Sequence, residues 1–247
     1  MLFEILYIVL FKINFVLYFT NDIDIELYEN YMYRNEFYHK YAKNIHSQNG
    51  EDGIVEELLK RLNIENGWVC EFGAWDGIYL SNTFNLTKKG FRSVFIEGDN
   101  DKFQDLLTTV NNYPNIIPIN KYVGYENIDG LDSILTNTEI PIDFDILSID
   151  VDSYDYQIWK SIKKYKPKIV IIEINSSVSI HNEFHIHCPG KYQSTGFHPM
   201  LQLGIEKGYT FVLHTGNMFF IRNDLFEQLN IPYNPLDNFR PNWGGAR

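Results

Sequence analysis

Short apolar runs alternate with segments of helical periodicity along most of this chain. Five runs have the length and composition of strands, at 68–72, 93–96, 116–119, 144–149 and 169–174. Segments with a helical pattern separate them, at 81–89, 101–110, 131–135 and 154–164. Another helix precedes the first strand, because one helical face carries Ile54, Val55, Leu58, Leu59 and Leu62. This alternation is typical of an α/β domain built on a parallel sheet.

The last part of the pattern differs from the rest. A polar loop covers 175–196, and a helical segment follows at 200–207. Two strand-like runs, 211–214 and 218–221, are then separated by three residues that suit a hairpin turn. Five parallel strands followed by a helix and a hairpin match the Rossmann-like, seven-stranded methyltransferase sheet, which is mostly parallel with a terminal antiparallel hairpin. We expect this α/β fold.

The pattern divides the chain into three parts. We expect an N-terminal extension over residues 1–45, the α/β domain over 46–230 and an irregular tail over 231–247. Residues 1–19 are largely apolar but contain Glu4 and Lys12, whereas a membrane-spanning helix needs about 20 mostly uncharged residues. They also lack the layout of a signal peptide. A packed element or a start codon placed too far upstream is favoured, and a membrane anchor through residues 1–19 is the less favoured alternative.

Composition narrows the classes of function. The chain has 21 basic and 32 acidic residues and a net charge of −11, so nucleic acid is not expected as a partner. Its two cysteines, Cys70 and Cys188, cannot form a disulfide framework. A reducing compartment follows, and we expect a cytoplasmic protein, with membrane association as a minor alternative.

Two strand ends carry the strongest signals of a binding site. The first strand contains Glu71 and leads into a turn with Gly73 and Gly77. The spacing of these glycines differs from the dinucleotide-binding pattern, and the turn lacks the lysine of a phosphate-binding loop. Glu97 ends the second strand, where an acid in such folds accepts hydrogen bonds from ribose hydroxyls. The two features favour a nucleoside cofactor without a pyrophosphate, and S-adenosylmethionine fits that description.

Five ordered segments resemble one family. They are 47–52, 71–77 with 80–83, 95–99, 145–154 and 166–175. The chain resembles the FkbM-like S-adenosylmethionine-dependent methyltransferases over about 47–221, although Ser153 stands where that family often has glycine. The resemblance implies that the cofactor turn contains Glu71, Gly73, Ala74 and Gly77, and that Glu97 holds the ribose. It also implies nearby positions for Gln48 and Ser81 at the methionine end and for Asn120 at the adenine edge. The full cofactor-binding set expected is Gln48, Glu71, Gly73, Ala74, Asp76, Gly77, Ser81, Glu97 and Asn120.

Acceptor chemistry is expected at the next strand ends. Asp150 and Asp152 follow the fourth strand, and Glu173 and Asn175 end the fifth, so the two pairs share the carboxyl edge where such folds bind ligands. These four side chains could hold Mg²⁺ against a sugar diol. A metal-free reaction with Asp150 or a histidine as base is the alternative.

The polar loop after the fifth strand carries His181, His185 and His187 beside Cys188. Their spacing does not match a zinc motif, and we expect this loop to line an acceptor pocket. Asp150, Asp152 and His181 are the candidate catalytic residues.

The expected function is methyl transfer from S-adenosylmethionine to a hydroxyl of a sugar or glycoconjugate, so a small-molecule or glycan acceptor is the expected partner. The acceptor class follows from the resemblance alone. A non-catalytic binding module that retains the methyltransferase fold is the alternative. A dinucleotide oxidoreductase is disfavoured by the glycine spacing.

Overall fold

The computed structural model describes residues 36–180, 182–191 and 193–231. The expectations for residues 1–19 and for His181, and nearly all of the expected tail, fall outside these residues. Within them, no helix has both the length and the apolar character needed to cross a bilayer.

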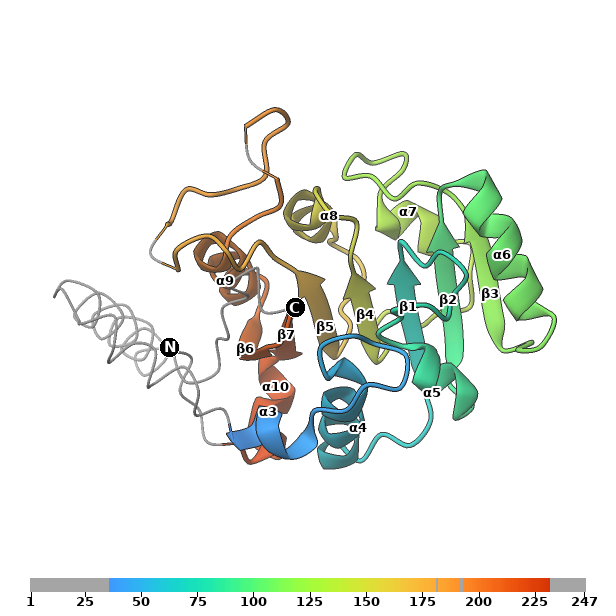
Figure 1. Cartoon of the computed structure of the whole chain (residues 1–247), viewed down its shortest axis with the longest axis horizontal. Helices are drawn as coiled ribbons and strands as arrows, with labels where there is room; N and C mark the ends of the chain where they lie inside the picture. Colours follow the sequence, from blue (N-terminus) through green and yellow to red (C-terminus); the bar gives the residue numbers. More distant parts are fainter. Residues whose placement is uncertain (1–35, 181, 192, 232–247) are drawn as a thin grey trace, which may run out of the picture.

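The described residues form one seven-stranded sheet in the order β3-β2-β1-β4-β5-β7-β6 (Figure 1). Its strands are β1 (Trp68–Phe72), β2 (Arg92–Glu97), β3 (Ile116–Asn120), β4 (Ile146–Ile149), β5 (Ile169–Glu173), β6 (Tyr209–His214) and β7 (Asn217–Arg222). Strands β1 to β5 are parallel. Strand β7 is antiparallel to both β5 and β6. The predicted fold class, a mostly parallel methyltransferase sheet with a terminal antiparallel hairpin, is confirmed.

Helices cover both faces of this sheet. They are α3 (Glu36–Tyr41), α4 (Glu51–Arg61), α5 (Phe84–Lys88), α6 (Asn100–Val110), α7 (Leu131–Leu135), α8 (Asp155–Ser161), α9 (Phe197–Glu206), α10 (Asn223–Phe226) and the 3₁₀ turn η1 (Glu227–Leu229). Residues of α4, α5 and α6 share one apolar cluster with one face of the strands. Residues of α7, α8 and α9 share a second cluster with the other face. The domain therefore has three layers, with the sheet in the middle.

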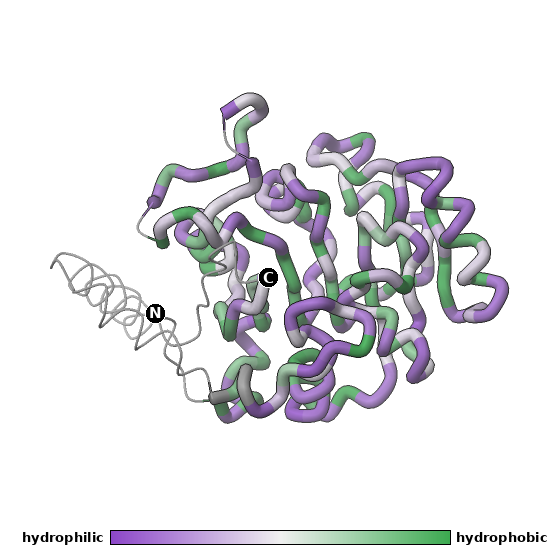
Figure 2. Tube along the Cα trace, in the orientation of Figure 1, coloured by the Kyte–Doolittle hydropathy of each residue, from purple (hydrophilic) through white to green (hydrophobic). Residues whose placement is uncertain are grey.

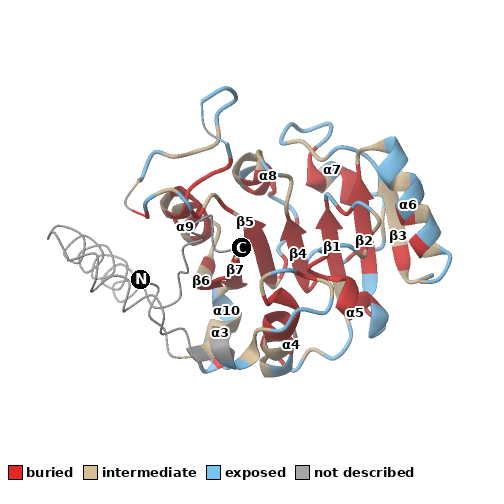
Figure 3. Cartoon of the chain, viewed as in Figure 1, coloured by how far each residue is buried: buried red, intermediate tan, exposed pale blue. Residues whose placement is uncertain are grey.

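Strand β5 shows why a continuous apolar run in the sequence predicts a central strand. Residues Ile169, Val170, Ile171 and Ile172 are all 0% exposed, because successive side chains point into opposite helical layers. Figure 3 shows the central strands as buried along nearly their whole length. Figure 2 shows the contrast between the hydrophobic β5 and the mainly hydrophilic outer helix α6.

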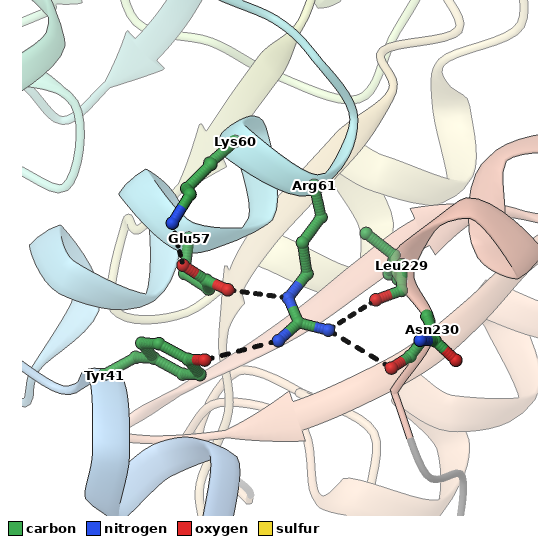
Figure 4. A network of polar contacts seen from close by, with 6 residues as sticks. All are labelled: Tyr41, Glu57, Lys60, Arg61, Leu229 and Asn230. Atoms are coloured by element: carbon green, nitrogen blue, oxygen red, sulfur yellow. Dashed lines mark hydrogen bonds and ion pairs between the residues drawn. The ribbon is translucent and has the colours of Figure 1, made fainter.

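One arginine joins the start of the described chain to its end (Figure 4). Arg61 of α4 donates to the carboxylate of Glu57 at 2.8 Å and to the carbonyl oxygen of Leu229 at 2.6 Å. Its remaining contacts reach the carbonyl oxygen of Asn230 at 3.2 Å and the hydroxyl of Tyr41 at 3.4 Å. A planar guanidinium can serve several acceptors at once, so this side chain holds α3, α4 and η1 together on one face.

A candidate active site at the carboxyl edge of the sheet

The turn after β1 lies close to the backbone that follows β4. Gly73 has a φ of +74°, and a Cβ at this position would lie 2.3 Å from the carbonyl oxygen of Asp150. Gly77 has a φ of +78°, and its Cβ would lie 2.8 Å from a methyl carbon of Leu106. Both positions need glycine for their backbone conformation and for packing within the protein. The expectation that these glycines admit a ligand to the backbone stays a prediction.

Glu97 lies against this turn, at the end of β2. One of its carboxylate oxygens accepts the amide of Trp75 at 2.8 Å, and the other accepts the amide of Asp99 at 2.7 Å. Trp75 has a φ of +45°, which is uncommon for a residue with a side chain. Because a carboxylate has about four lone-pair sites, Glu97 keeps acceptor capacity beyond these two amides, and its contact with a ribose stays a prediction. Asn120 donates to the carbonyl oxygen of Glu97 at 3.2 Å, so it lies beside this acid.

Glu71 has a local role that the sequence did not reveal. It is buried, and it accepts hydrogen bonds from the hydroxyl of Ser81 at 2.9 Å and from the hydroxyl and amide of Thr83 at 2.6 and 3.0 Å. Burial raises the pKa of Glu71, and these hydrogen bonds act in the opposite direction. The predicted helix over 81–89 therefore starts only at Phe84, because residues 81–83 are turned toward this carboxylate. Direct contact of Glu71 or Ser81 with a cofactor stays a prediction.

The other residues of the expected cofactor set lie in different surroundings. Asp76 accepts the amides of Ile78 and Tyr79 at 2.8 and 2.7 Å and so closes the turn. Ala74 is buried and donates to the carbonyl oxygen of Ile96. Gln48 is exposed in the loop before α4. The structure thus brings Ala74, Glu97 and Asn120 together at the ends of β1 to β3.

Three carboxylates meet at the ends of β4 and β5, as the parallel order of these strands predicts. One oxygen from each of Asp150, Asp152 and Glu173 lies within 4.8 Å of the others. Burial, followed by the charge of neighbouring carboxylates, raises the pKa of Asp150 to about 7 and that of Glu173 to about 8. The metal-free cluster therefore holds protons near neutral pH.

Asp155 supports this cluster and was not predicted to. This aspartate is 1% exposed and accepts the amides of Val151 at 2.9 Å and Ser153 at 3.0 Å. Burial is the main cause that raises its pKa to about 6. The loop between β4 and α8 also tolerates Ser153 without difficulty, because the residue with a positive φ is its neighbour Asp152, at +60°. The sequence signal that could have identified Asp155 is its position in the first turn of the predicted helix, where an aspartate often accepts hydrogen bonds from backbone amides.

The amide oxygen of Asn175 is engaged in hydrogen bonds within its own loop. That oxygen accepts the amide and the hydroxyl of Ser177, and the amide nitrogen donates to the carbonyl oxygen of Gln193 at 3.2 Å. The side chain therefore holds the loop over 175–196. Asn217, which was missed, lies opposite Glu173 in the register of β5 and β7. Only the sheet order places it there.

The polar loop after β5 returns across α8. The ring of His187 meets the ring of Tyr154 edge-on, with 4.5 Å between centroids. Tyr154 in turn stacks on Tyr125 at 5.5 Å. Burial lowers the pKa of His185. Tyr154 follows Asp152 by two positions in the chain, and its ring joins those of Tyr125 and His187 in one aromatic group. The expectation that this loop lines an acceptor pocket stays a prediction.

Comparisons with known proteins give a likeness in fold. No protein-family model and no curated protein matches the chain. Among solved structures, it is similar to a SAM-dependent methyltransferase from Aquifex aeolicus, with 10% identity, coverage of 81% of this chain and 99% of that chain, and a TM-score of 0.41. It is also similar to M. jannaschii TYW2 in complex with AdoMet, with 14% identity, coverage of 73% and 79%, and a TM-score of 0.41. A third is the N-terminal domain of EvdMO1 with SAH and D-fucose, with 10% identity, coverage of 69% and 80%, and a TM-score of 0.44. At these values the fold assignment rests on the strand order and connections described above.

Proposed function

We propose that this protein transfers a methyl group from S-adenosylmethionine to a hydroxyl of a sugar or glycoconjugate. The observation that carries the proposal is the pairing of two features on one sheet edge. Glu97 lies beside the β1 turn with spare acceptor capacity, and the carboxylates of Asp150 and Glu173 lie at the ends of β4 and β5. Ligands of doubly wound sheets bind along this edge.

The residues present suit such a cofactor chemically. When bound, S-adenosylmethionine supplies a methyl group on a cationic sulfur, and transfer breaks the S–CH₃ bond, forms an O–CH₃ bond and releases the hydroxyl proton. Glu97 would hold the ribose hydroxyls. When ionised, the carboxylates around Asp150 would favour a positive charge, and one of their oxygens would accept the acceptor's proton. Alignment of the two reactants would supply much of the acceleration.

A sugar acceptor is supported by the motifs that carry the family resemblance and by the surroundings of the cluster. Tyr154 follows the cluster residue Asp152 by two positions, and its ring stacks on that of Tyr125, which is 46% exposed. Aromatic faces pack well on the apolar faces of sugar rings, while carboxylates accept hydrogen bonds from sugar hydroxyls. The segment 150–154 carries side chains of both kinds.

Calorimetric titration with S-adenosylmethionine and S-adenosylhomocysteine tests the cofactor. We expect binding by the wild type and an affinity lower by about 10- to 100-fold in Glu97→Ala, because hydrogen bonds to a charged acceptor are lost. Glu97→Gln keeps the volume and one acceptor, so its loss should be smaller. The matched control is Glu139→Ala, since the ion pair of Glu139 with Arg92 lies at the other end of β2. Absence of binding by folded wild type would refute the cofactor assignment.

Turnover is tested separately, by a mass-spectrometric search for methylated products among candidate sugars. We expect a product whose mass rises by one CH₂ group and whose formation requires the cofactor. Cofactor binding without product from any hydroxyl acceptor would instead favour the binding-module alternative.

A further inference from the structure

Four oxygen-bearing side chains gather where β4 and β5 end and β7 begins. The carboxylates of Asp150, Asp152 and Glu173 form the group within 4.8 Å. Asn217 is the first residue of β7 and pairs with Glu173 across the antiparallel register. Side chains directly opposite one another in such a pair leave the sheet on the same face, with Cβ atoms about 5 Å apart. Asn217 therefore belongs beside the three carboxylates.

The orientation of the Asn217 amide follows from its neighbour. Glu51, at the start of α4, is 0% exposed, and one of its oxygens accepts from the hydroxyl of Thr215 at 2.6 Å and from the amide nitrogen of Asn217 at 3.5 Å. A carboxylate oxygen can only accept from these groups. The amide nitrogen of Asn217 must therefore face Glu51, which turns the amide oxygen away from it.

That oxygen is left in an unusual position. Asn217 is only 5% exposed, and its amide oxygen is buried without a hydrogen-bond partner among the described residues. One carboxylate oxygen of Glu173, its cross-strand neighbour, is buried without a partner in the same way. Each unsatisfied buried acceptor costs about 1–3 kcal/mol. Two buried acceptors on cross-strand partners, with no donor from the described residues, are groups that a bound cation would satisfy.

We propose that Asp150, Asp152, Glu173 and Asn217 bind one divalent metal cation, and we name these four residues the oxygen cluster. All four can bind a metal through oxygen, and none carries an imidazole or a thiolate, which selects hard cations such as Mg²⁺, Mn²⁺ and Ca²⁺. Its use in catalysis rests on the proposed function, in which the cation would hold the acceptor's oxygen and favour loss of its proton. Its existence does not rest on that function.

The dimensions of the oxygen cluster suit such an ion. Ligands on opposite sides of Mg²⁺ lie about 4.2 Å apart, and on opposite sides of Ca²⁺ about 5 Å apart. The three carboxylate oxygens lie no more than 4.8 Å from one another, which is within the span across Ca²⁺, whereas neighbouring ligands of Mg²⁺ lie about 3 Å apart, so the smaller ion would draw the side chains inward. Asp152 is exposed, so an ion can reach the buried oxygens of Glu173 and Asn217 from solvent. A proton on Glu173 could be shared with only one other oxygen of the cluster, whereas a bound cation would contact all four side chains.

Titration of the whole chain with MgCl₂, MnCl₂ and CaCl₂ tests the site without cofactor or acceptor. Calorimetry and the loss of free Mn²⁺ signal in electron paramagnetic resonance should both give saturable binding at one site. Asp152→Asn should weaken binding by about tenfold or more, because it removes a charged ligand. This side chain is exposed, so the variant keeps its fold. Asn217→Ala should weaken binding by a smaller factor.

Two controls separate this site from general attraction of cations. Asn175→Ala should bind the metal as the wild type does, because the Asn175 amide holds the loop. Glu139→Gln should do so as well, because its carboxylate pairs with Arg92 at the start of β2, whereas the oxygen cluster lies at the carboxyl edge of the sheet. No saturable binding of any of the three ions by folded wild type, or equal binding by Asp152→Asn, would overturn the proposal. Neither result would affect cofactor binding measured separately, so failure of the metal site and failure of the proposed function are distinguishable.

Discussion

Gly73→Ala should lower the free energy of unfolding by about 2–5 kcal/mol. A residue with a side chain at a φ of +74° costs about 1–2 kcal/mol. The added methyl group would also lie 2.3 Å from the carbonyl oxygen of Asp150, and forcing an extra carbon into such a space costs about 1–3 kcal/mol. Because β1 and β4 are hydrogen-bonded neighbours, neither backbone can move away without weakening the centre of the sheet.

Urea denaturation followed by circular dichroism measures this loss, and Gly208→Ala is the matched control. Gly208 has a φ of +84°, but nothing lies within 4 Å of its Cβ position. It should therefore show only the backbone cost of about 1–2 kcal/mol. Equal losses in the two variants would refute the reasoning that close approach of β1 and β4 requires glycine at position 73.

Three further predictions concern other contacts. In metal-free protein, the raised pKa of Glu173 means that its contribution to stability is complete below its ordinary value of 4.5 and is lost as pH rises through about 8. Urea unfolding across that range should show the loss, and an unchanged slope in Glu173→Gln would contradict it. Trp75→Gly should be about 1 kcal/mol more stable than Trp75→Ala in the same assay, because the φ of +45° favours glycine; the reverse order would argue against a strained turn. Lys168→Met should cost about 1–3 kcal/mol, because Lys168 donates to the buried carboxylate of Asp145 at 2.6 Å; wild-type stability of the variant would show that this pair contributes nothing.

Local patterns predicted the sheet well because its strands are unusually uniform. The run Ile169–Glu173 became β5, since four consecutive apolar residues can be buried only where helices cover both faces. The terminal hairpin was equally readable, because Thr215 and Gly216 interrupt two strand-like runs. The parallel order also predicted that Asp150 and Glu173 meet, because parallel strands end at one edge.

Errors arose where a distant residue competes with local preference. The segment 81–89 has a helical pattern, yet its first residues bond to Glu71 on the neighbouring strand. Asn175 has the expected residue type at the expected strand end, but a serine two positions later takes its oxygen. In both cases a hydrogen bond within reach of the folded backbone overrides a pattern read along the chain.

The sequence alone determined the class of fold, the succession of its five parallel strands along the chain and the strand ends at which acids gather, because these depend on hydrophobic periodicity and short connections. Tertiary structure decided which acids support loops and which face one another. Glu71 and Asp155 became supports, whereas Asn217 joined Glu173 only because β7 lies between β5 and β6. Burial and hydrogen-bond partners are properties of neighbours in space, and a hairpin strand brings in neighbours that no local spacing records.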